Sequence, residues 1–186
     1  MESGSMVLSN TLVADSWMSA PRWPDVRGSG VYVQAGSLDA VNCTLTHNQG
    51  ARALQNASGT VAVRNSILYF NNSDTAQIGG IVQVTYSDVQ GSWEGEGNRD
   101  YNPALDVGYC IIPGSPAMDA GEGSPAANDA FPPGLGASRN DMGHKGGPGG
   151  ALWIDPVSTG TRDVFRVETG QLILGPAAMT FHWNTL

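Results

Sequence analysis

The sequence predicts an all-β protein in which short strands stack, one turn of the chain upon the next, as a solenoid. Three observations predict this class. Glycine contributes 25 of the 186 residues and charged residues only 14%, and glycine and small polar residues disfavour helices. Hydrophobic residues make up 40% of the chain, which is enough to form a core. A short alternating pattern also recurs at a nearly fixed spacing.

The recurring pattern has a period of about 22 residues. It occupies residues 8–12, 41–45, 63–67 and 85–89, and its fourth positions are Thr11, Thr44, Ser66 and Asp88. The last three are 22 residues apart, whereas the first gap is 33 and contains an insertion rich in Trp and Pro. Such a period without a helical pattern is typical of one turn of a β-solenoid. An antiparallel sandwich is the alternative, although it would not require a fixed spacing.

Alternation along each segment assigns its side chains to two faces. The set expected to point into the core is Leu8, Asn10, Leu12, Val41, Cys43, Leu45, Val63, Asn65 and Ile67. In this register Val41 and Val63 stack in one apolar column. Asn10 and Asn65 would then be buried, where each amide needs hydrogen-bond partners.

The coils and the segment after them resemble the right-handed parallel β-helix proteins of the pectate-lyase-like superfamily. Residues 30–33 with 41–48 are similar to a typical coil, as are residues 65–72 and 86–91. Residues 113–121 (PGSPAMDAG) resemble the block that ends many such helices, and residues 139–143 (RNDMG) the segment that follows it. The next residues, 144–146 (HKG), depart from the family pattern, which has an aromatic and an acidic residue there. The resemblance covers roughly residues 6–146.

This resemblance divides the chain into three parts. Residues 1–112 are expected to form the β-helix coils, and residues 113–146 the block that caps their end. Residues 147–186 are expected to form a Gly-rich linker and a short β appendage. In that appendage, residues 163–168 and 171–174 are predicted to form a hairpin, with 179–183 as a further strand.

Charge and composition limit the partners. The net charge is −8, and Lys145 is the single lysine, so a nucleic-acid surface with clustered basic residues is not expected. No apolar run approaches the roughly 18 residues that a membrane-spanning helix needs. The N-terminal residues lack the features of a signal peptide, so the chain is either cytoplasmic or a fragment of a longer protein. The resemblance favours the second reading and implies a secreted or cell-surface location. Cys43 and Cys110 are expected to be two buried thiols rather than a disulfide.

Members of the superfamily that cleave acidic polysaccharide use a basic residue on the outer face of the solenoid, often with Ca²⁺. The only basic residues on the regular coils are Arg52 and Arg64, and a guanidinium is a demanding base because it is nearly always protonated. Hydrolases place several carboxylates on adjacent strands. Asp39, Asp74 and Asp88 do not fall at equal offsets, so we expect them to be separate surface acids.

Three aspartates in the expected capping block are candidate metal ligands. With carbonyl oxygens from turns, Asp119, Asp129 and Asp141 could hold Ca²⁺. The alternative is that they cap turns by accepting backbone N–H groups, and no calcium-loop spacing is present to decide otherwise. No other cofactor is expected. His144 next to Lys145 suggests an acid–base pair, but the Gly-rich surroundings predict no fixed geometry for it.

Four residues are candidates for contact with a ligand. Trp17, Trp23 and Trp93 lie where the sequence departs from the coil pattern, and with Arg64 they could contact a sugar chain beside a flat β-face. The alternative is that these tryptophans seal the core.

The expected function is a non-catalytic module of a bacterial surface or secreted β-helix, structural, adhesive or glycan-contacting. An enzyme is the less favoured reading; it would be a polysaccharide lyase or glycoside hydrolase acting on acidic polysaccharide. The expected partners are a polysaccharide or another surface protein, and the open N-terminal coil could also mediate self-association.

Overall fold

The computed structural model describes residues 4–17, 28–71, 76–153 and the backbone of 172–174. It is built mainly of short strands, and the helices in the described residues are two 3₁₀ segments, η1 (Pro125–Ala127) and η2 (Pro148–Trp153). The all-β prediction is therefore confirmed.

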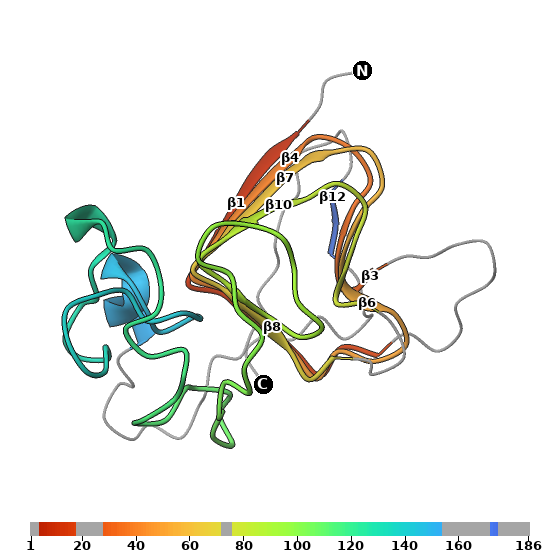
Figure 1. Ribbon diagram of the computed structural model, residues 1–186. Coiled ribbons are helices and arrows are strands. Elements are labelled where there is room, and N and C mark those ends of the chain that lie inside the picture. Colours follow the sequence, from red (N-terminus) through yellow and green to blue (C-terminus); the bar gives the residue numbers. More distant parts are fainter. Residues whose placement is uncertain (1–3, 18–27, 72–75, 154–171, 175–186) are drawn as a thin grey trace, which may run out of the picture.

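The chain passes through three sheets in turn, so that every third strand belongs to the same sheet (Figure 1). The first sheet holds β1 (Ser5–Ser9), β4 (Ser37–Val41), β7 (Thr60–Arg64) and β10 (Gln83–Thr85). The second holds β2 (Leu12–Ala14), β5 (Thr44–Thr46), β8 (Ile67–Tyr69) and β11 (Asp88–Val89). The third holds β12 (Leu172–Leu174), β3 (Gly28–Val33), β6 (Arg52–Asn56) and β9 (Ile78–Gly79).

All pairings between these strands are parallel, which rules out the antiparallel sandwich. Ser5 pairs with Ser37 and Ser37 with Thr60, so the first two turns are 32 and 23 residues long. The third is 21 residues long, because Ala62 pairs with Gln83. The predicted period near 22, with a longer first turn, is confirmed.

The inner faces of the three sheets share one apolar core. It draws on every turn, through Val13, Val31, Val33, Leu38, Ala40, Cys43, Leu45, Ala53, Leu54, Val61, Val63, Leu68, Ile78, Val82, Val84 and Val89. These side chains are at most 8% exposed. Burial of this much apolar surface is the main term that holds stacked short strands together.

The predicted register is wrong by one residue in two of the four segments. Val41 pairs with Arg64, whereas Val63 pairs with Ala40, so Val41 and Val63 point to opposite faces and do not form a column. The residues equivalent to Thr44 and Asp88 are Leu12 and Ile67, not Thr11 and Ser66.

The register error has a physical cause at the corner between the first and second sheets. Asn10, Asn42 and Asn65 occupy equivalent positions there, immediately after β1, β4 and β7, and all three have a positive φ near 50°. A residue in this left-handed conformation interrupts strict alternation, and asparagine tolerates it better than most residues. Asn10 and Asn65 are buried and hydrogen-bonded, as predicted, but their side chains contact residues 122–146 and do not belong to the apolar core.

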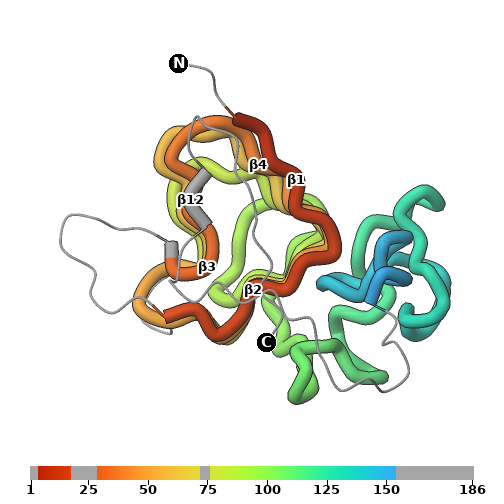
Figure 2. The backbone as a smooth tube through the Cα atoms, turned by 180° about the vertical axis from the view of Figure 1, so that it is seen from behind, coloured from red at the N-terminus to blue at the C-terminus, as the bar shows by residue number. Residues whose placement is uncertain are grey.

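The segment predicted to cap the end of the coils lies along their side. Figures 1 and 2, seen from opposite sides, both place the residues from about 105 to 153 beside the stack, next to that corner. A second core, of Ile67, Ala117, Ala120 and Met142, joins this segment to the outer face of β8. We call residues 103–153 the flanking segment. The expected linker at 147–150 also belongs to it, because η2 packs against the first turn: Trp153 Nε1 donates to the backbone oxygen of Asn10.

The edge strands of the last turn are contacted by residues 93–101 instead. Asn98 Nδ2 donates to the backbone oxygen of Val84 in β10, at 2.9 Å. The backbone of Arg99 bonds Ser87 and Val89 around β11. At the opposite edge of the third sheet, β12 pairs with β3 in parallel. The strand predicted at 171–174 thus exists, while its expected partners at 163–168 and 179–183 lie outside the described residues.

Candidate functional site

The asparagine corner fixes the flanking segment to the coils. Asn10 Nδ2 donates to the backbone oxygens of His144 (3.0 Å) and Gly146 (2.7 Å). Asn42 Nδ2 donates to the backbone oxygen of Asp141 and to Oδ1 of Asn140, both at 3.0 Å. One turn further on, Asn65 accepts two hydrogen bonds from the flanking segment: its Oδ1 accepts the backbone N–H of Glu122 and its backbone oxygen accepts that of Gly143, both at 2.8 Å. Asn10 and Asn42 therefore satisfy carbonyl groups, and Asn65 satisfies N–H groups, of an irregular segment that would otherwise be buried without partners.

The three candidate calcium ligands are brought together next to this corner. Asp141 Oδ1 accepts the backbone N–H of Asp119 (2.7 Å), and Asp129 accepts that of Asp141 (3.0 Å). Both oxygens of Asp119 accept the backbone N–H of Ala137, at 3.0 Å. These are the contacts of the turn-capping alternative.

The surroundings of Asp129 and Asp141 disfavour the charged forms of both carboxylates. Burial raises the pKa of Asp129 to about 7, and the nearby charge of Asp141 acts in the same direction. Burial likewise raises the pKa of Asp141, together with the charge of Asp119. Among the residues that the structure describes, no group of three or more His, Cys, Asp or Glu side chains is arranged to hold a metal ion. Calcium binding stays a prediction.

A small pocket of about 180 Å³ lies where the flanking segment meets β5. Cys110 and His144 face each other in its wall, with 3.8 Å between Sγ and Nε2. The other ring nitrogen of His144, Nδ1, lies 3.0 Å from Thr44 Oγ1. Thr44 Oγ1 also accepts the backbone N–H of His144, at 3.1 Å. The imidazole therefore contacts a thiol through one ring nitrogen and a hydroxyl through the other.

His144 is held firmly in this position. Its side chain is 2% exposed, and Trp153 packs edge-on against the imidazole with 4.8 Å between ring centroids. Burial lowers the pKa of His144 to about 4, and the charge of Lys145 adds to that effect. The imidazole is consequently neutral at pH 7, with one nitrogen available as a proton acceptor.

The sequence did not predict this pocket. His144 was expected to lack fixed geometry, but Asn10, Thr44 and Trp153 fix its backbone and its ring. Cys110 was expected to be buried and is half-buried. The residues come from positions 44, 110 and 144, and no local motif links them.

Of the four predicted sugar-contacting residues, the three that the structure describes lie on different parts of it. Trp17 is 68% exposed and forms an isolated parallel bridge with Gln49, three residues after β2 ends. Trp93 packs against the core, and its Nε1 donates to the backbone oxygen of Val82, so it seals the last turn as the alternative reading expected. Trp23 lies outside the described residues.

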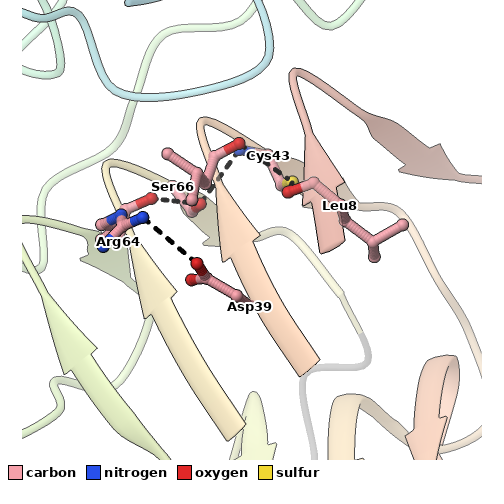
Figure 3. A network of polar contacts seen from close by, with 6 residues as sticks. Leu8, Asp39, Cys43, Arg64 and Ser66 are labelled. Atoms are coloured by element: carbon pink, nitrogen blue, oxygen red, sulfur yellow. Dashed lines mark hydrogen bonds and ion pairs between the residues drawn. The ribbon is translucent and has the colours of Figure 1, made fainter. Parts of the chain in front are cut away.

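Arg64 lies on the outer face of the first sheet, where it forms an ion pair with Asp39 of the neighbouring strand (3.2 Å; Figure 3). Arg52, on the third sheet, donates to Gln55 Oε1 at 3.0 Å. Asp88 is buried, with one oxygen accepting the backbone N–H of Tyr101. Asp74 lies outside the described residues. The acids and bases of the coils therefore meet only as the pair of Asp39 and Arg64 among the residues described.

Cys43 differs from Cys110 in being fully enclosed. Its Sγ lies 3.5 Å from the backbone oxygen of Leu8, and its N–H donates to Ser66 Oγ at 3.0 Å (Figure 3). Burial raises the pKa of the Cys43 thiol to about 12. The prediction of a buried thiol is confirmed for this residue.

Comparison of the chain with family models, curated proteins and solved structures found no match. Within the described residues, no helix has the length and apolar character needed to cross a membrane.

Proposed function

We propose that this chain is part of a right-handed parallel β-helix that serves as a non-catalytic structural or adhesive module of a secreted or surface protein. The observation that carries the proposal is the succession of parallel strands in three sheets, with the flanking segment fixed along one side. Solenoids of this kind provide long, regular surfaces whose curvature and side-chain rows suit extended partners.

The outer face of the first sheet is the surface we assign to the partner. Most of its exposed side chains are polar, with Val7 as an apolar exception: Ser5, Val7, Ser9, Thr60, Arg64 and Gln83. The flanking segment lies at the neighbouring corner and leaves this face open (Figures 1 and 2). A flat row of hydroxyl, amide and charged groups suits a polysaccharide or a polar protein surface. Self-association through the open edges of β1 and β2 remains part of the proposal.

The alternative enzyme, a polysaccharide lyase or hydrolase, has one observation in its favour: Arg64 and Asp39 share a face. In this pair, however, the Arg64 guanidinium donates to the carboxylate, and a guanidinium is rarely neutral. We therefore prefer the binding function. Incubation with pectate, alginate and polygalacturonate distinguishes the two, because only the enzyme would produce unsaturated or new reducing ends.

A glycan array, combined with co-sedimentation on insoluble polysaccharides, tests the binding face. Arg64→Ala should weaken retention at least several-fold while changing stability little, since an exposed ion pair contributes at most about 1 kcal/mol. Arg52→Ala is the matched control, because it removes the same charge from the third sheet. Equal losses for both variants, or no binding by the unchanged protein, would refute the assignment of this face.

A further inference from the structure

The pocket between β5 and the flanking segment brings together a thiol, a proton acceptor and a group that orients that acceptor. Such a site needs a nucleophile and a base within hydrogen-bond reach, and a third group that orients the base. Cys110 Sγ and His144 Nε2 supply the first two, at 3.8 Å. Thr44 Oγ1 supplies the third, because it contacts both Nδ1 and the backbone N–H of His144. The three groups are independent of the outer face of the first sheet.

We propose that Cys110 is a modification site whose thiol is oxidised by a small hydroperoxide, with His144 as the proton carrier and Thr44 as its positioning residue. The reaction joins the Cys110 sulfur to one peroxide oxygen and breaks the O–O bond. The sulfur is oxidised to a sulfenic acid, and the peroxide is reduced to water or an alcohol. The thiol proton passes to His144 Nε2 and then to the departing oxygen, so protons and electrons balance.

The size and lining of the pocket favour a small oxidant. A volume of about 180 Å³ equals that of roughly six liquid waters, which accommodates hydrogen peroxide or a short alkyl hydroperoxide but not a folded peptide segment. Ile111, Leu135 and Met142 make part of the wall apolar. Lys145 also lines the pocket and can stabilise the negative charge that develops on the departing oxygen.

The charged groups around His144 are consistent with a proton transfer that begins from a neutral Cys110 thiol and a neutral His144 imidazole. Lys145 disfavours the imidazolium and Asp106 favours it, while burial disfavours it most. The resting pair is therefore a thiol and a neutral imidazole, and the proton moves as the S–O bond forms. Cys43 provides an internal comparison, because it is enclosed in the core and does not line this pocket.

The test treats the whole chain with hydrogen peroxide in the presence of dimedone, which traps sulfenic acids, and locates the adduct by peptide mass spectrometry. We expect the adduct on Cys110 and not on Cys43, because only Cys110 of the two lines the pocket. His144→Gln should slow the reaction at least several-fold, because it removes the proton acceptor beside the thiol. Thr44→Val should slow it less, and Thr46→Val, the matched control on the same strand, should leave it unchanged.

A second probe separates proton transfer from simple access. Iodoacetamide releases iodide, which needs no proton, so His144→Gln should slow alkylation of Cys110 less than it slows oxidation. A circular dichroism spectrum like that of the unchanged protein establishes that each variant is folded. An unchanged oxidation rate in His144→Gln, equal slowing of oxidation and alkylation by that substitution, or an adduct on Cys43 as fast as on Cys110 would each overturn the proposal.

Discussion

Replacement of Asn42 by alanine tests how strongly the asparagine corner stabilises the fold. The Asn42 side chain is 2% exposed, and its Nδ2 donates to the backbone oxygen of Asp141 and to Asn140 Oδ1 at 3.0 Å each. Loss of two buried hydrogen bonds costs about 2 kcal/mol or more, because their acceptors stay buried without a donor. The positive φ of 49° adds about 1 kcal/mol for alanine. We expect a total of about 3 kcal/mol.

The assay is urea unfolding monitored by far-ultraviolet circular dichroism. The dependence of the unfolding free energy on urea concentration must be the same for all variants compared. Asn42→Gly should cost about 1 kcal/mol less than Asn42→Ala, since glycine accepts the left-handed conformation. Asn42→Asp keeps the shape but points carboxylate oxygens at carbonyl oxygens, so it should cost at least as much as alanine. Asn102→Ala, which removes one exposed bond to the Ala104 N–H, is the control and should cost less than 1 kcal/mol. A loss below 1 kcal/mol for Asn42→Ala, or a stable Asn42→Asp, would refute the reasoning.

Three further perturbations test other parts of the structure. The pKa of His144 is lowered from 6.5 to about 4, so the unfolded chain binds more protons and the free energy of unfolding falls as pH drops from about 6.5 to 4. In urea titrations at several pH values, His144→Gln should lose this contribution to the pH dependence of stability. An unchanged pH dependence would contradict the prediction. Burial raises the pKa of Asp88 to about 7, so this group destabilises the fold as pH rises from about 4 to 7. Asp88→Asn should therefore be more stable than the unchanged protein at pH 8, by about 1 kcal/mol or more, and close to it at pH 4; a variant less stable at pH 8 would disprove this. Ile67→Ala should lower the unfolding free energy by about 2–5 kcal/mol because Ile67 is fully buried between β8 and the flanking segment, and a loss below 1 kcal/mol in denaturant titration would show that the second core is loosely packed.

The sequence was sufficient to predict that equivalent strands recur at a nearly constant spacing. It was not sufficient to predict which residue of one strand lies beside which residue of the next. A recurring pattern with a constant spacing follows from the pairing of equivalent strands, so the period could be read without a structure. The predicted register assumed that side chains alternate strictly between the two faces. This alternation is interrupted at Asn10, Asn42 and Asn65, which have a left-handed backbone conformation. One such residue per turn shifts which neighbours point inward, and this explains why Val41 was assigned to the core although it faces outward.

The location of residues 103–153 could not be predicted because it depends on contacts between distant parts of the chain. The resemblance of residues 113–121 and 139–143 to a terminal block suggested an end cap, yet the asparagine amides offer donors along the side of the stack. The pocket follows from the same docking, since it sets Cys110 and His144 against Thr44. Backbone carbonyls that need donors leave no periodic pattern in a sequence.

Paired cysteines on the outer face of the first sheet test the parallel stack and its register most directly. In a Cys110→Ser background, Val41→Cys with Arg64→Cys places two thiols on adjacent strands at paired positions, which is within the range of a disulfide. Mild oxidation should crosslink this pair, detected by mass spectrometry and by migration on non-reducing gels. Val41→Cys with Val63→Cys should stay reduced, because Val63 faces the core. Crosslinking of the second pair instead of the first would contradict the arrangement of strands described above.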